Sequence, residues 1–133
     1  MKISEFMSTR LVTVEPDDTL EVMQEIFANT RFHHLLVLDK GRLAGVVSDR
    51  DVLRNLSPYL GSTSEHYRDL ATAKRRTHQI MSRNPLTLTG NQTLAEVITL
   101  FREHPVSCIP VLDETGELAG IVTWRDILGF VSV

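Results

Sequence analysis

The chain has little cysteine, no long apolar run and no excess of basic residues, and each shortage excludes a class of protein. Cys108 is the single cysteine among 133 residues, so no internal disulfide can form and a cytoplasmic location is expected. No apolar run approaches the roughly 20 residues that cross a bilayer, and residues 1–6 lack the apolar centre of a signal peptide. The formal net charge of -3 argues against nucleic-acid binding, which relies on an excess of Lys and Arg. We therefore expect neither a membrane nor a nucleic acid as partner.

The sequence also lacks the motifs of common catalytic and metal sites. It has no glycine-rich phosphate loop, no pairing of a nucleophile with a base, and no HExxH or paired-Cys spacing. His33 and His34 are adjacent, but a His before a buried strand is more often a packing residue than a metal ligand. Cys108, inside an apolar run, is expected to act as a small buried hydrophobe. We expect no enzyme activity, no metal site and no required cofactor.

What the chain does contain is a long internal repeat. Residues 7–53 return about 75 residues later as residues 81–128, with one additional residue, Thr115, in a turn of the second copy. The segment GVVSDRD at 45–51 corresponds to GIVTWRD at 120–126. A repeat of this length, with matching turns and matching polar endings, predicts two copies of one supersecondary unit.

One helix in each copy is predicted from a stripe of apolar residues at helical spacing. Thr93 with Glu96 forms a capping-box signature at the start of the second helix, and Asp18 with Glu21 is expected to cap the first. The two stripes consist of Leu20, Met23, Ile26 and Phe27 in the first copy and Leu94, Val97, Ile98 and Phe101 in the second.

Short apolar runs bounded by turn residues predict the strands, and each last strand runs into a short helix. The expected strands are residues 11–14, 34–38 and 43–47 in the first copy and 86–88, 108–112 and 118–122 in the second. The expected short helices lie near residues 49–56 and 124–130.

Each copy therefore reads strand, helix, strand, strand, helix. The predicted class is α/β (α+β), with two β-α-β-β-α repeats packed pseudo-symmetrically through their sheets. We assign residues 1–56 to the first repeat, 57–79 to a partly helical connector and 80–133 to the second repeat.

The duplicated pattern resembles a tandem pair of cystathionine β-synthase (CBS) domains, also called a Bateman module. The endings at 45–51 and 120–126 fit the family's pattern of glycine, two apolar residues, Ser or Thr, two variable residues and Asp. The run at 106–113 fits the family's central strand. The match covers nearly the whole chain apart from part of the connector. The chain is thus similar to a stand-alone CBS protein rather than to an enzyme that carries such a pair.

The resemblance implies binding of an adenosine derivative, such as AMP, ADP, ATP or S-adenosylmethionine, in clefts between the repeats. The chemistry of the two endings suits such a ligand. A carboxylate can accept two ribose hydroxyl protons, while a guanidinium and the free N–H groups of a helix start both favour phosphate. The residues with these roles are Ser48, Arg50 and Asp51 in the first copy and Thr123, Arg125 and Asp126 in the second.

An adenine base needs an apolar slot edged by a few polar groups. In the family, the base-binding strands of one copy face the Ser or Thr and the Asp of the other. By this resemblance the first cleft joins Val12, Phe32, His33 and His34 to Thr123 and Asp126, and the second joins Leu86, Val106, Ser107 and Cys108 to Ser48 and Asp51. The histidines are bulkier than their counterparts, so the two clefts are not expected to have equal affinity.

Simpler interpretations of the same residues stay open. The pattern Ser/Thr-x-x-Asp is itself a capping motif, so both pairs are also explained as helix starts, and capping can coexist with binding. Arg50 and Arg125 are equally compatible with solvated surface positions. Trp124 fits either a cover for the base or packing at a dimer interface.

The resemblance implies a ligand-sensing regulatory module without catalysis, whose state is read by an unknown regulated protein or by a second subunit. Because family members usually form flat dimers through apolar helix faces, a homodimer is expected. The alternative is a structural protein for oligomerisation or interaction, with empty clefts. The residues expected at the dimer interface are Val22, Ile26, Ile98 and Leu128.

Overall fold

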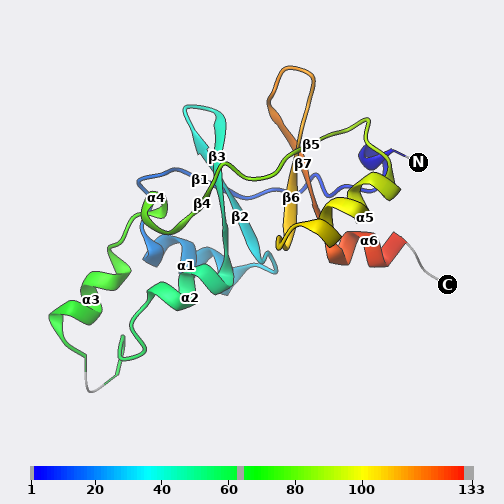
Figure 1. Ribbon diagram of the computed structural model, residues 1–133. Helices are drawn as coiled ribbons and strands as arrows, with labels where there is room; N and C mark the ends of the chain where they lie inside the picture. The colour runs from blue at the N-terminus through cyan, green and yellow to red at the C-terminus, as the bar shows by residue number, and fades with distance from the viewer. Residues whose placement is uncertain (1, 63–64, 131–133) are drawn as a thin grey trace. The chain divides into compact units, whose positions relative to one another are not determined.

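The computed structural model describes residues 2–62 and 65–130 (Figure 1). The chain divides into two compact units. Val12–Asn84 forms one, which we call the first-repeat unit, and Met1–Leu11 together with Pro85–Val133 forms the other, the second-repeat unit. In the described part of the chain, no helix is both long and apolar enough to span a membrane.

The first-repeat unit contains a four-stranded sheet in the order β1-β2-β3-β4, covered by helices. Strand β1 runs parallel to β2, and the other neighbouring pairs are antiparallel. The elements are β1 (Thr13–Val14), α1 (Leu20–Asn29), β2 (His34–Asp39), β3 (Arg42–Ser48), α2 (Asp49–Asn55), α3 (Tyr67–Ala73), α4 (Thr77–Ile80) and β4 (Ser82–Arg83).

The second-repeat unit contains a three-stranded sheet in the order β5-β6-β7, again with one parallel and one antiparallel pair. Its elements are the 3-10 helix η1 (Ile3–Glu5), β5 (Leu88–Thr89), α5 (Leu94–Glu103), β6 (Cys108–Leu112), β7 (Leu118–Thr123) and α6 (Trp124–Phe130).

The predicted order of strand, helix, strand, strand, helix is confirmed in both units, as β1-α1-β2-β3-α2 and β5-α5-β6-β7-α6. The mixed α/β class is confirmed as well. The first strand of each repeat is shorter than expected and begins later, so Val12 and Leu86 precede β1 and β5 rather than lie within them. The connector assigned to residues 57–79 contains α3 and all of α4 except its last residue, Ile80.

The predicted cap of the first long helix is wrong by one residue. Thr19, not Asp18, is the N-cap of α1, and its side chain accepts a hydrogen bond from the backbone N–H of Val22. Asp18 instead accepts the backbone N–H of Glu15 at 2.7 Å and so closes the preceding turn. In the second repeat Thr93 caps α5 as expected, with Glu96 N–H as donor.

Each repeat begins with a short segment before its first strand, which we call its leading segment: residues 2–11 in the first repeat, and α4 with β4 (residues 77–83) in the second. Each leading segment packs within the unit that contains the other repeat. Ser8 exchanges two backbone hydrogen bonds of 2.9 Å with Ile121 of β7, and Ile3 N–H donates to Gln92 O at 2.8 Å. In the first-repeat unit, Ser82 of β4 pairs with Val46 of β3 in the matching way. Neither compact unit therefore coincides with one sequence repeat.

Buried apolar side chains form a separate core in each unit. The strands contribute β-branched and leucine side chains, and the long helix contributes the buried part of its apolar stripe. The core of the first-repeat unit consists of Val14, Leu20, Met23, Leu35, Val37, Val47 and Val52. The core of the second-repeat unit consists of Ile3, Leu88, Val97, Phe101, Ile109, Val111, Val122 and Ile127.

The connector is attached to the end of α2 by a polar network around buried Asp69. Ser57 Oγ donates to Asp69 Oδ1 at 2.5 Å, and the backbone N–H of His66 donates to Asp69 Oδ2 at 2.8 Å. Thr72 Oγ1 accepts Ser57 N–H at 3.0 Å and donates to Asp69 O at 2.7 Å. These donors, the Ser57 hydroxyl foremost, lower the pKa of Asp69 below its ordinary value of 3.8.

Acid is therefore expected to weaken this attachment. Because the folded-state pKa of Asp69 is lowered, its contribution to stability is present above the ordinary pKa and is lost as the pH falls through the lowered one. Replacing Asp69 with Asn should remove this part of the pH dependence of the unfolding free energy, measured by urea denaturation between pH 7 and pH 2. Ser57→Ala, which removes the strongest donor, should reduce it in part. An unchanged pH dependence in Asp69→Asn would contradict this assignment.

Candidate functional site

Ser48 and Asp51 come together where β3 passes into α2. Ser48 is the N-cap of α2: its Oγ accepts the backbone N–H of Asp51 at 3.1 Å, and Asp51 Oδ2 accepts the backbone N–H of Ser48 at 2.8 Å. Both side chains are half-buried. The reciprocal bonds hold the Asp51 carboxylate at the end of the sheet in a fixed orientation.

Thr123 and Asp126 repeat this geometry where β7 passes into α6. Asp126 Oδ2 accepts the backbone N–H of Thr123 at 2.8 Å and the Thr123 hydroxyl at 3.2 Å. The backbone N–H of Asp126 donates to Thr123 Oγ1 at 3.3 Å. The structure thus gives both predicted pairs a capping role.

Capping uses one carboxylate oxygen of each Asp. Among the described residues, the hydrogen bonds accepted by the side-chain carboxylates of Asp51 and Asp126 all go to Oδ2, and none goes to Oδ1. A carboxylate has about four lone-pair positions, so each group keeps acceptor capacity for donors from outside the chain. Capping and ligand binding are therefore compatible at both pairs.

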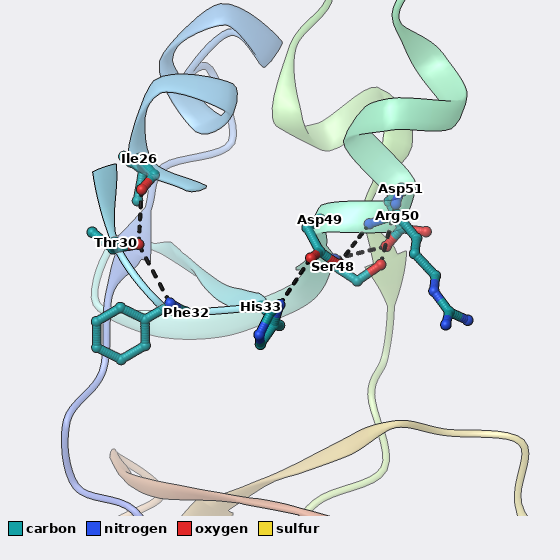
Figure 2. Close-up of polar contacts among 8 residues, drawn as sticks. All are labelled: Ile26, Thr30, Phe32, His33, Ser48, Asp49, Arg50 and Asp51. Atoms are coloured by element: carbon teal, nitrogen blue, oxygen red, sulfur yellow. Dashed lines mark hydrogen bonds and ion pairs between the residues drawn. The ribbon is translucent and has the colours of Figure 1, made fainter. Parts of the chain in front are cut away.

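The first repeat places two histidines beside its pair. His34 of β2 lies opposite Ser48 of β3 in the strand register, and His33 Nδ1 lies 2.9 Å from Asp49 Oδ2 (Figure 2). Burial lowers the pKa of His34.

Phe32 is half-buried on the other side of His33, and its backbone N–H donates to Thr30 Oγ1 at 3.4 Å. Val12 O accepts the backbone N–H of Leu36 at 3.1 Å, which places Val12 beside the same sheet.

In the second repeat, Cys108 of β6 lies opposite Thr123 of β7, as His34 lies opposite Ser48. Cys108 is buried, as expected of a small hydrophobe, and Ser107 is exposed. Val106 and Leu86 are partly buried and pack against the core of the second-repeat unit. The crossed assignment of base-binding residues to the Ser48 and Thr123 pairs stays a prediction.

Arg50 and Arg125 are both exposed at the second position of their helices. In Figure 2 the guanidinium of Arg50 points away from His33 and Asp49. The phosphate role of the two arginines stays a prediction.

Asp49 lies beside the candidate Ser48–Asp51 site, and the sequence pattern does not indicate it. It occupies a variable position of the Ser/Thr-x-x-Asp pattern, and its counterpart in the second repeat is Trp124. Nothing in the pattern marks such a position. A direct comparison of the two copies could have found it, because this position changes from a carboxylate to an indole.

A duplicated α/β unit with a capped Ser/Thr–Asp pair at the same place in each copy defines a tandem pair of one domain type. The sequence model of the CBS domain matches residues 3–58 and 78–133. The chain belongs to the CBS domain family.

Relatives and solved structures agree with this placement. A CBS domain-containing protein from Dictyostelium discoideum is 35% identical over 131 residues, which is 95% of this chain and 88% of that protein. CBSX2, solved in complex with AMP, is 26% identical with a TM-score of 0.76, covering 95% of this chain and 92% of that one. CBSX2 comes from Arabidopsis thaliana. The cytosolic domain of the Mg2+ channel MgtE, solved with ATP, is 27% identical with a TM-score of 0.72, covering 95% of this chain and 47% of that one.

Several other relatives are longer than this chain. The chain spans 46% of an uncharacterized protein from Methanocaldococcus jannaschii, and 22% of the inosine-5'-monophosphate dehydrogenase from Aquifex aeolicus.

Proposed function

We propose that this protein is a non-catalytic regulatory module that binds an adenosine derivative through its Ser48–Asp51 and Thr123–Asp126 pairs. The observation that carries the proposal is the geometry of the two carboxylates. Each is fixed by its cap through Oδ2 and keeps Oδ1 without a hydrogen bond to a described residue. Such a group can accept ribose hydroxyl protons without giving up its structural role.

The family placement supports the same ligand class. Two CBS structures more than 25% identical to this chain were solved with AMP and with ATP. ADP and S-adenosylmethionine share the adenosine part of these ligands and are further candidates. The proposed binding partner is thus an adenosine-containing small molecule, and no cofactor is required.

Thermal stability tests the proposal directly. At 100 times its dissociation constant, a ligand that binds the folded state alone stabilises it by about 2.7 kcal/mol, so the melting temperature should rise. We expect at least one compound of the panel AMP, ADP, ATP and S-adenosylmethionine to raise it. The double variant Asp51→Asn and Asp126→Asn should lose most of this rise, because an amide keeps the shape of the cap but removes a charged acceptor.

The control for that experiment is the melting temperature without ligand. The amide oxygen can still accept the N–H groups of Ser48 and Thr123, so the ligand-free double variant should remain folded. An equal ligand-induced rise in wild type and double variant would contradict the proposed role of the two carboxylates.

A second candidate function, oligomerisation or interaction with empty clefts, is favoured by exposed apolar side chains. Leu53 of α2 is 67% exposed, Val22 of α1 is 41% exposed, and Leu128 of α6 is 69% exposed. Apolar side chains on helix faces suit a protein interface, so a homodimer belongs to both hypotheses. The thermal panel separates them, because a purely structural protein would respond to no compound. A cytoplasmic location and a regulated partner protein are part of the proposal.

A further inference from the structure

The two Ser/Thr–Asp pairs lie in surroundings of different charge. In the first repeat, Asp49 stands between Ser48 and Asp51, so two carboxylates lie at the start of α2. In the second repeat, Trp124 takes the place of Asp49, and Asp126 is the single carboxylate among residues 123–126.

Asp49 is held in place beside the Ser48–Asp51 pair. Its Oδ2 lies 2.9 Å from His33 Nδ1, and its Oδ1 accepts the backbone N–H of Arg50 at 2.9 Å. Its side chain is 38% exposed, which leaves its charge only partly screened by water. Figure 2 shows the carboxylate next to Ser48, with the Arg50 guanidinium directed away from it.

The neighbouring His34 does not offset this negative charge. Burial lowers the pKa of His34, while the carboxylates of Asp49 and Asp51 act in the opposite direction and His33 lowers it further. Burial is the largest of these influences, so the imidazole is neutral at neutral pH.

The corresponding place in the second repeat is uncharged and fixed by packing. The indole of Trp124 contacts the ring of Phe101, with centroids 4.9 Å apart and an angle of 43° between the planes. Cys108 occupies the strand position of His34. A ligand phosphate near Thr123 and Asp126 would meet one fewer carboxylate than a phosphate near Ser48 and Asp51.

We propose that the two pairs select different adenosine ligands: Thr123–Asp126 prefers a phosphate-bearing nucleotide, and Ser48–Asp51 prefers an adenosine derivative without net negative charge. This inference rests on the proposed function and assigns a ligand class to each of its sites. Asp49 is the residue that determines the difference, since its carboxylate repels a phosphate and attracts a cationic group such as a sulfonium. One additional charge within several ångströms, partly screened by water, changes a binding constant by on the order of tenfold.

Single-site variants allow each pair to be measured separately by isothermal titration calorimetry. Asp126→Asn leaves the Ser48–Asp51 pair intact, and Asp51→Asn leaves the Thr123–Asp126 pair intact. The probes differ in net charge at neutral pH: adenosine is neutral, AMP is negative and S-adenosylmethionine is positive. We expect Asp126→Asn to bind S-adenosylmethionine about tenfold more tightly than AMP, and Asp51→Asn to show the reverse order.

Asp49→Asn in the Asp126→Asn background supplies the decisive comparison. The amide removes the charge but keeps an acceptor for Arg50 N–H, so the affinity for AMP relative to adenosine should rise about tenfold. Asp49→Ser provides a second uncharged variant if the first folds poorly, which circular dichroism would show. Equal ligand preferences in the two single-site variants, or no effect of either Asp49 replacement, would overturn this inference and leave the proposed function standing. No binding of any of these probes, nor of ADP or ATP, by the wild-type protein would overturn both.

Discussion

Replacing Ile3 with Ala is expected to reduce the unfolding free energy of the second-repeat unit by about 2–5 kcal/mol. Ile3 is fully buried and belongs to the core of that unit, although it lies more than 80 residues before β5 in the sequence. The substitution removes apolar atoms and leaves a cavity that the surrounding strands cannot fill. The loss is a large fraction of the stability of a typical domain.

Fluorescence of Trp124 during urea unfolding measures this effect in the correct unit, because the chain contains one tryptophan and it begins α6. Lys2→Ala is the matched control, since Lys2 is exposed and adjacent to Ile3. Its effect should stay within about 0.5 kcal/mol. If Ile3→Ala unfolds at the same urea concentration as Lys2→Ala, the leading segment does not stabilise the second repeat.

Replacing Gly120 or Gly45 with Ala is expected to destabilise the protein by about 1–3 kcal/mol. A Cβ on Gly120 would lie 2.9 Å from the backbone oxygen of Ser8 and 2.7 Å from Met7 Sδ. A Cβ on Gly45 would lie 2.7 Å from the backbone oxygen of Ser82. The methionine can move aside, but the backbone oxygen is fixed by strand pairing, so the leading segment would be pushed off the sheet.

Gly129→Ala is the matched control for these substitutions. Gly129 lies in α6, and a Cβ there would meet no heavy atom within 4 Å. Alanine in a helix is favoured over glycine by up to about 1 kcal/mol, so this variant should be at least as stable as the wild type. Equal midpoints of urea unfolding for Gly120→Ala and Gly129→Ala would show that close contact is not the reason for glycine in the GIVTWRD segment.

The sequence was sufficient to predict the elements that have strong local signals. The apolar run from residue 108 to residue 112 has the length of a buried strand, and the stripe containing Val97 and Phe101 has the period of an amphipathic helix. Both elements were confirmed. The cap of α1 was misplaced because Asp18 and Thr19 are adjacent and both are good N-cap residues. Comparison with Thr93 in the second copy would have selected Thr19.

Packing of the leading segments within the opposite repeat's unit was harder to predict. Met7 and Ser8 carry no periodicity, and η1 and β4 have three and two residues, which is too short for a pattern to register. The packing of these segments is determined by tertiary contacts, such as the close approach of Met7 and Ser8 to Gly120. Ile3 and Thr77 occupy equivalent positions in the two copies, and both are fully buried. The sequence alone did not show this equivalence, because one side chain is apolar and the other is polar.

The candidate site was partly predictable for the same reason. Ser48, Asp51, Thr123 and Asp126 follow from the repeated ending and the family resemblance. Asp49 escaped because its importance depends on a contact with His33, which lies 16 residues earlier and is brought near by the antiparallel pairing of β2 and β3. Side-chain contacts of this kind are properties of the fold rather than of a motif.

Titration of the wild-type protein with AMP, ADP, ATP and S-adenosylmethionine by isothermal titration calorimetry tests the central claim most directly. We expect saturable heat with at least one compound, at a stoichiometry of one or two ligands per chain, and its loss in the Asp51→Asn and Asp126→Asn double variant. Absence of saturable heat with every compound at millimolar concentration would contradict it.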